Sequence, residues 1–352
     1  MKHLRVAAKW ALAALALALL ARTLWKADLA HALDLVRGLG PAALALAVPA
    51  LFVLVFETIA WQLSVAPLGH PPLLRLAEVR LATDAVLMSI PGGVVVSEWL
   101  IPVTLRDRCQ MTLPAATAAS VARKWLGTRA HALYILLAAA LGWSFLGQRS
   151  PALPWIVAAS ALLPLSLSVA MELAASRGSV ATRIWSLLPR SFATRRHGFA
   201  ATDAELVRVM QQDRRRAATA TLLYLAAWLC ESVEAFVVAR ALGAHLGFTD
   251  VLAVEAGLSL VRSVAFFAPS GIGVQDLGYV AIFGEVGAAF VLVKRTRELA
   301  WIAAGYLFLV VRSSFVTKCS WSARRSPIKS GSNSTVPRIA ISSEVSLSDR
   351  RI

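Results

Sequence analysis

The sequence has few charged residues, few cysteines and no long polar block before residue 317. Only 16% of its 352 residues are charged, whereas 58% are hydrophobic. A soluble domain must present a polar surface to water, so this composition excludes an ordinary water-soluble fold. Apolar segments long enough to cross a bilayer recur along the chain, which predicts an all-α, polytopic membrane helix bundle.

The residues that bind metals and nucleotides also lack the expected spacing. The three cysteines form no CxxC motif, and the six histidines are scattered without an HExxH motif. This spacing supports neither a disulfide framework nor a zinc site. Gly271 and Gly273 do not complete a GxGxxG motif. We therefore expect no metal, no cofactor and no enzyme activity.

The chain is strongly basic, with 36 Lys and Arg against 20 Asp and Glu and a formal net charge of +16. In a soluble protein this excess would indicate a nucleic-acid partner. Here the basic residues lie mostly between apolar segments, where they would remain on the cytoplasmic side and contact anionic lipids. We expect membrane lipids, and no nucleic acid, as partners.

The apolar pattern predicts a membrane domain over residues 1–316. Residues 10–21 follow a basic start and are predicted to be a signal anchor, with a cleaved signal peptide as the alternative. Further crossings are expected at 41–65, 131–147, 152–172, 217–238 and 298–316. Residues 173–216 form a basic cytoplasmic loop, with either a short amphipathic helix or a solvated chain at 203–216.

Residues 317–352 are rich in Ser and Arg and are predicted to be a disordered, polar cytoplasmic tail, although a frameshifted gene end would look similar. The topology that follows places the N-terminus and the tail in the cytoplasm and the protein in a bacterial inner membrane.

Two further apolar elements are interrupted. Residues 79–105 contain PGGVVVSE (91–98), and residues 251–285 contain PSGIGVQD (269–276), with Pro, Gly, Val and an acid in the same register. Each is predicted to be a re-entrant or broken helix, and Pro102 is a further break in the first. Three crossings between them make the pair an inverted repeat, with a chance match as the alternative. The helix-break residues are Pro91, Gly92, Gly93, Pro269, Gly271 and Gly273.

Charged side chains inside apolar segments indicate a polar interior, because each costs at least about 2.5–3.5 kcal/mol in hydrocarbon. Asp84 and Arg262 precede the two motif prolines by the same seven residues, and their opposite charges predict that they pair. The alternatives are a structural ion pair for these two, and a position at headgroup level for Glu57, Glu98 and Glu231. The predicted substrate-path residues are Asp84, Glu98, Glu231, Glu234, Arg262, Gln275 and Asp276.

Two segments carry a family resemblance. FFAPSGIGVQDLGY (266–279) and VKRTRELAWIAAG (293–305) resemble the flippase-like membrane family related to the transmembrane region of lysylphosphatidylglycerol synthase, including its hopanoid-associated branch. The resemblance extends over about residues 5–315 and implies a lipid-translocating or lipid-handling membrane domain. Because only a polar tail follows residue 317, no counterpart of the soluble aminoacyl-transferring domain is expected.

Three functions remain as hypotheses. The leading one is a lipid flippase or transporter that lets a polar headgroup cross through a groove between the two interrupted elements, with Arg262 attracting phosphate. An accessory subunit that acts with envelope-lipid biosynthesis proteins on hopanoids or glycolipids is the second. A membrane-embedded lipid-modifying enzyme with Asp276 or Glu98 as acid or base is the least favoured.

Overall fold

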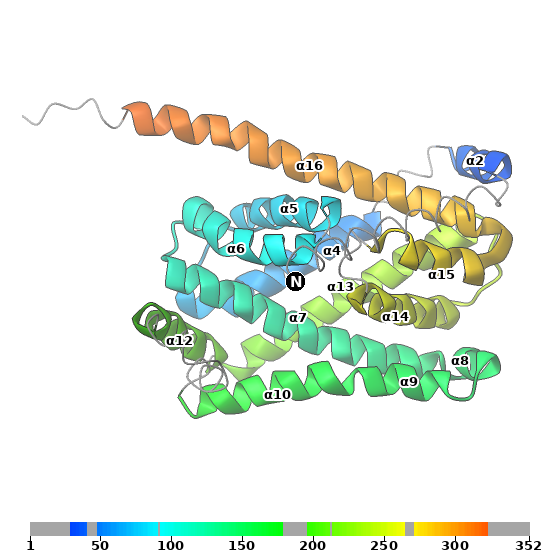
Figure 1. The fold of residues 1–352 in the computed structure, drawn as a ribbon, viewed down its shortest axis with the longest axis horizontal. Helices are drawn as coiled ribbons and strands as arrows, with labels where there is room; N and C mark the ends of the chain where they lie inside the picture. Colours follow the sequence, from blue (N-terminus) through cyan, green and yellow to red (C-terminus); the bar gives the residue numbers. More distant parts are fainter. Residues whose placement is uncertain are drawn as a thin grey trace, which may run out of the picture. The chain divides into compact units, whose positions relative to one another are not determined.

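The computed structural model describes residues 29–40, 48–90, 92–178, 196–211, 213–264 and 271–322. The chain divides into two compact units, 1–310 and 311–352. The described residues of the first unit form helices and no strands, as the composition predicts (Figure 1). In chain order the helices are α2 (Leu29–Gly38), α4 (Val48–Val65), η1 (Ala66–Leu68), α5 (Leu73–Ser89), α6 (Gly93–Cys109), α7 (Leu113–Leu141), α8 (Trp143–Arg149), α9 (Leu153–Ser160), α10 (Leu162–Ser176), α12 (Arg196–Met210), α13 (Arg214–Ala241), α14 (Phe248–Val264), α15 (Val274–Phe283), η4 (Gly284–Val286) and α16 (Gly287–Ser322).

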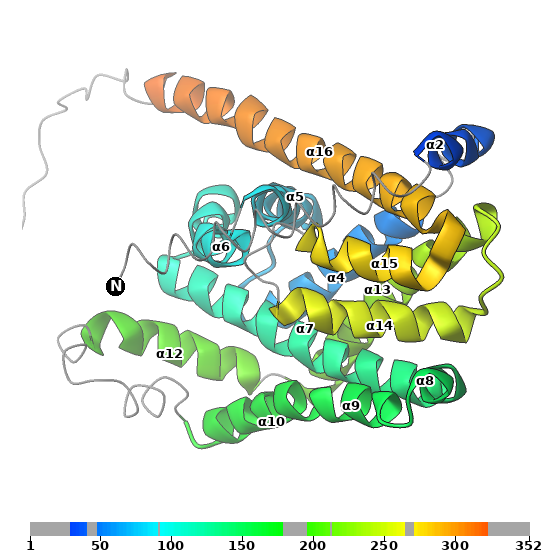
Figure 2. The same cartoon turned by 45° about the vertical axis from the view of Figure 1, so that its right-hand side comes forward.

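The long helices α4, α7 and α13 pack against one another and form the centre of the bundle (Figures 1 and 2). Alanines dominate the contact, because small side chains allow helix backbones to approach closely without the help of the hydrophobic effect. Trp61 of α4 is fully buried and donates its Nε1–H to the carbonyl oxygen of Ala119 in α7 at 3.2 Å. This bond satisfies the one polar atom of a large core side chain.

The first interrupted element is a hairpin of α5 and α6 with a break at residues 90–92. Gly92 has a φ of +71°, which an L side chain rarely adopts. A Cβ on Gly93 would lie 2.4 Å from the carbonyl oxygen of Leu87, so the turn closes too tightly for any other residue. α5 ends at Ser89 and α6 begins at Gly93, and Pro91 lies outside the described residues. The expected second break at Pro102 is wrong, because α6 continues through it.

The second interrupted element comprises α14 and α15. The intervening residues 265–270, including Pro269, lie outside the described residues, and Gly271 and Gly273 follow with φ values of +67° and +86°. α15 then folds back against α16, since Asp276 and Arg295 are 2.6 Å apart although 19 residues separate them. In Figure 1 the α5–α6 and α14–α15 pairs extend from opposite ends of the bundle toward its middle. The inverted repeat itself remains a prediction.

Within the described part of the chain, four helical stretches are long and apolar enough to cross a membrane, namely 48–68, 153–175, 214–241 and 274–308, and the α7–α8 pair, bent by 72°, is a fifth candidate. The bounds correct several predicted spans. α7 starts at Leu113, so Arg123, Lys124 and Arg129 lie within a helix and not in a loop.

The remaining differences concern the ends of the predicted segments. Within the predicted basic loop 173–216, the described part contains α12 and the first turn of α13, which includes the arginines at 214–216. α16 begins at Gly287, eleven residues before the predicted final span, and its amino-terminal part is therefore charged. The predicted anchor 10–21 and residues 323–352 lie outside the described residues.

α16 packs closely on α5 at Gly305, where a glycine is required. A Cβ on Gly305 would lie 2.2 Å from the carbonyl oxygen of Leu81 and 2.6 Å from the Cβ of Ala85. We expect Gly305→Ala to push α16 away from α5 and to lower the melting temperature of the purified protein in detergent. Gly257→Ala in α14 is the matched control, because that position is open and alanine favours helix. Equal melting temperatures for the two variants would contradict this close packing.

Candidate functional site

Buried and partly buried charged side chains from six helices gather in the first unit, and we call this set the charge network. Its members are Glu57 of α4, Arg80 and Asp84 of α5, Glu231 and Glu234 of α13, Glu255 of α14, Asp276 of α15, and Lys294, Arg295, Arg297 and Glu298 of α16.

The bonds of Asp276 hold α15 against α16. Asp276 is fully buried and accepts two hydrogen bonds from Arg295, from Nη2 at 2.6 Å and from Nε at 3.0 Å. Its other oxygen also accepts the backbone N–H of Gly273 at 3.0 Å, at the amino end of α15. The same arginine also pairs with Glu298 one turn further along α16. A planar guanidinium can bind two carboxylates in this way because it has five donors in a fixed fork.

The next charges of α16 connect it to α13 and α14. Arg297 donates to Glu234 at 2.6 Å. Lys294 donates to the hydroxyl of Tyr279 at 2.6 Å, and its Nζ lies 3.7 Å from Glu255. One charged turn of α16 therefore bonds to three different helices.

The other end of the charge network joins α4 to α5. Arg80 forms an ion pair with Glu57 and a second, at 3.2 Å, with Asp84 one turn away. Glu231 of α13 influences the electrostatics of both Arg80 and Arg297, but none of the ion pairs and hydrogen bonds given above for the described residues connects the two ends. The predicted pair of Asp84 and Arg262 is wrong, because Asp84 bonds to Arg80 instead.

Pairing is what makes these charges tolerable in an apolar protein. An isolated charge in hydrocarbon is costly, whereas an ion pair with additional hydrogen bonds recovers most of the cost of dehydration. The recovery depends on geometry, so each pair also fixes the relative position of two helices. The network therefore explains why the bundle can hold so many charges in its interior.

Arg262 differs from the cations of the charge network, and it shares this difference with Arg123, which lies over the ring of Trp61. Among the described residues Arg262 forms none of the ion pairs, and its guanidinium lies over the ring of Trp228, 5.7 Å from the centroid. A contact with a ring face leaves the N–H donors of arginine unused. Its side chain also lies beside the break before α15, where a Cβ on Gly271 would be 3.3 Å from it and from Oε1 of Gln275.

Gln275 completes this part of the site. It is 1% exposed, and its Nε2 donates to the hydroxyl of Tyr279 at 2.9 Å, whereas its buried Oε1 accepts no hydrogen bond. With respect to the described residues, Arg262 and Gln275 thus provide polar groups without hydrogen-bond partners next to an interrupted helix. The structure brings these two predicted residues together.

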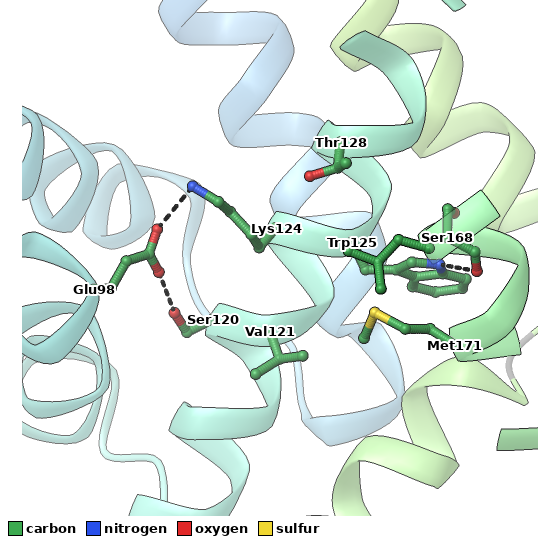
Figure 3. A pocket seen from close by; sticks show the side chains of 9 residues that line it. Glu98, Ser120, Val121, Lys124, Trp125, Thr128, Ser168 and Met171 are labelled. Carbon is green, nitrogen blue, oxygen red and sulfur yellow. Dashed lines mark hydrogen bonds and ion pairs between the residues drawn. The ribbon is translucent and has the colours of Figure 1, made fainter. Parts of the chain in front are cut away.

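Glu98 lies elsewhere. It accepts from Lys124 at 3.2 Å and from the hydroxyl of Ser120 at 3.4 Å, at the edge of a pocket of about 380 Å³ between α6, α7 and α10 (Figure 3). The second interrupted element contributes no residue to this pocket. The predicted substrate-path residues therefore do not all line one groove, since Glu98 is separate from the charge network.

Several members of the charge network were not predicted from the sequence. They are Arg80, Glu255, Lys294, Arg295, Arg297 and Glu298. The signal available was the KRTRE segment at 294–298, which is flanked by apolar residues and which the predicted topology left outside or at an interface. Four charges within five residues of an apolar helix require partners, and the single acid among them, Glu298, cannot pair with all three cations, so acids of other helices are needed.

The long apolar helices and the buried ion pairs define a multi-pass helical membrane protein. The sequence matches the family described as the lysylphosphatidylglycerol synthase TM region over residues 6–296, so the chain belongs to that family. No curated protein and no solved structure matches the chain.

The bond between Asp276 and Arg295 gives a testable prediction. Asp276→Asn retains the shape of the side chain but removes its charge, which leaves a buried guanidinium partly unpaired. We expect this substitution to lower the free energy of unfolding by about 3–5 kcal/mol, the usual effect of removing one partner of a buried pair. Reversible unfolding in mixed micelles would measure the difference.

The matched control is Asp107→Asn, which breaks the exposed pair of Arg106 and Asp107 on α6. An exposed pair contributes only about 0–1 kcal/mol. If both variants lose the same stability, the bond at Asp276 does not have the structural role assigned to it.

Proposed function

We propose that the protein is a lipid flippase or transporter of the bacterial inner membrane, and that it moves a polar lipid between leaflets without changing it covalently. The phosphate would bind at Arg262. The acyl chains would remain in the bilayer while the headgroup passes along polar side chains, so that no bare charge enters hydrocarbon. Membership of the lysylphosphatidylglycerol synthase TM family supports a role with lipids.

The observation that carries the proposal is the state of Arg262. Among the described residues, the three cations of the charged turn of α16 are each paired with an acid, whereas Arg262, like Arg123 over Trp61, lies over a ring and forms no ion pair. An anion would find complementary charge there. The amino end of α15, a helix of ten residues, follows within the same break and contributes its dipole.

Gln275 supports the same assignment. The two ends of the glutamine amide would exchange places if the hydroxyl of Tyr279, which also interacts with Lys294 and Glu255, turned its one proton toward Oε1. After such an exchange the amide N–H groups would face the break beside Arg262. A phosphate oxygen would then have donors from two side chains.

The charge network would serve as a scaffold and not as the phosphate site. Its acids and bases satisfy one another, so they position α5, α13, α14, α15 and α16 around Arg262. An accessory role beside envelope-lipid biosynthesis proteins is the alternative function. An accessory role would need no cation without an acidic partner at the break. Because Arg262 forms no ion pair among the described residues, it favours transport.

Removal of the Arg262 guanidinium tests the proposal. We expect Arg262→Ala to reduce movement of a fluorescent phospholipid in proteoliposomes to the rate of protein-free vesicles, because the phosphate loses its counter-charge. Arg262→Lys should retain partial activity, since it keeps the charge but loses the fork. Quenching of the label in the outer leaflet by dithionite measures the movement.

Arg149→Ala is the matched control, because Arg149 also lies over a ring, that of Phe145 in α8, away from the break. It should leave transport unchanged. Wild-type rates in the Arg262→Ala variant would remove Arg262 from the mechanism, provided that the variant is reconstituted to the same density.

The proposed topology has its own test. Reporter fusions after residues 200 and 320 should be cytoplasmic, and fusions after residues 148 and 245 should be on the outer side, as required for a cytoplasmic N-terminus and tail. Paired alkaline phosphatase and fluorescent protein reporters distinguish the two sides. A cytoplasmic reporter after residue 245 would contradict the inverted orientation of the second interrupted element.

A further inference from the structure

The pocket beside Glu98 has an amphipathic lining that the charge network does not explain. It measures about 380 Å³, within the range of small-ligand sites, and lies between α6, α7 and α10. Figure 3 shows that Glu98, Lys124 and Ser120 gather at one end, while Trp125 and Met171 lie at the other. One end is therefore charged and the other is apolar.

The ion pair at the charged end is loose and partly exposed. The side chains of Lys124 and Glu98 are 61% and 31% exposed, and their charged atoms are 3.2 Å apart. Such a pair contributes little to stability, so a ligand can replace it at little cost. The ammonium has three donors and the carboxylate two acceptor oxygens, which leaves capacity for further partners on both groups.

The apolar end presents a ring and aliphatic chains. Trp125 is buried and donates its Nε1–H to the carbonyl oxygen of Ser168 at 3.2 Å, so no polar atom of the indole remains for a ligand. Met171 and Leu167 of α10 complete the wall. This surface fits a hydrocarbon chain, and the hydroxyl groups of Thr128 and Ser168 are the polar side-chain groups of the lining near it.

The pocket adjoins the most exposed of the candidate spans. The stretch 153–175, which comprises α9 and α10, is the least buried of the four, and Leu163 and Leu167 on it are 77% and 56% exposed. In a membrane protein such leucines face acyl chains. The pocket is thus accessible to a molecule that is already in the bilayer.

We propose that this pocket binds a phospholipid whose headgroup carries both a phosphate and a protonated primary amine, as in phosphatidylethanolamine. Lys124 pairs with the phosphate, Glu98 accepts from the ammonium, and an acyl chain lies against Trp125 and Met171. The site selects against a quaternary amine, which has no N–H to donate, and against an anionic headgroup, which would face Glu98. The inference rests on the proposed lipid-handling function and adds the headgroup chemistry.

Native mass spectrometry of the full-length, delipidated protein in detergent tests this assignment. Dioleoyl phosphatidylethanolamine should bind more tightly than the phosphatidylcholine and phosphatidylglycerol with the same chains. Glu98→Gln should weaken the binding of phosphatidylethanolamine by about tenfold, which is the effect of one charge-assisted hydrogen bond. It should also remove the preference for this lipid over the other two. Lys124→Met should weaken the binding of all three lipids, because each carries a phosphate. Asp107→Asn, which changes an exposed acid of the same helix outside the pocket, should change none of them.

Two results would overturn the assignment. The first is equal binding of the three lipids by the wild-type protein. The second is an unchanged preference for phosphatidylethanolamine in a Glu98→Gln variant whose melting temperature equals that of the wild type. Failure of the proposed function is distinguishable, because the binding measurement does not depend on movement. Selective binding by a wild type that moves no lipid would refute transport alone, whereas transport without selective binding would refute the pocket assignment alone.

Discussion

Buried charges can persist in this bundle only because they are paired, and most of the architecture follows from that constraint. α16 contributes three cations within four residues, and each bonds to a different helix. In an apolar environment, removing one partner of an ion pair is strongly destabilising, because the other charge is left buried and unpaired. Replacing the whole pair with an apolar contact changes the stability much less. The ion pairs therefore specify which helices are neighbours, and the alanine-rich contacts of α4, α7 and α13 provide the close packing that surrounds them.

The same constraint separates residues that hold the structure from residues that are available to a ligand. Asp276, with bonds to Arg295 and to the N–H of Gly273, has little capacity left. Arg262 stacks on Trp228 and Glu98 belongs to a loose, exposed pair, so both retain capacity for further hydrogen bonds. Sequence position alone treats these three residues alike, because all are charges in or beside interrupted apolar elements.

Local features of the fold were predictable from the sequence, and long-range ones were not. The break at Gly92 and Gly93 is encoded by the residues themselves, since only glycine accommodates a positive φ and so close a carbonyl. The bond of Arg297 to Glu234 joins residues 63 positions apart, and no periodicity of a single chain identifies such a partner. The predicted topology consequently left the charges of α16 outside the membrane or at an interface. In the structure they lie in a turn of α16 that is bonded to three other helices. Likewise, the neighbours of Glu98 depend on how α6 packs on α7.

The close approach at Gly305 limits how the bundle can move. With no side chain between them, the backbones of α16 and α5 are in direct contact, and rotation of α16 about its axis would drive a larger residue into Leu81. At its other end, Gly287 is held as tightly against Val280 of α15. A helix that is in close backbone contact with its neighbours at two positions is expected to move with them as a rigid body. Any rearrangement that opens a passage must therefore carry α5, α15 and α16 together and be hinged at the helices that surround them.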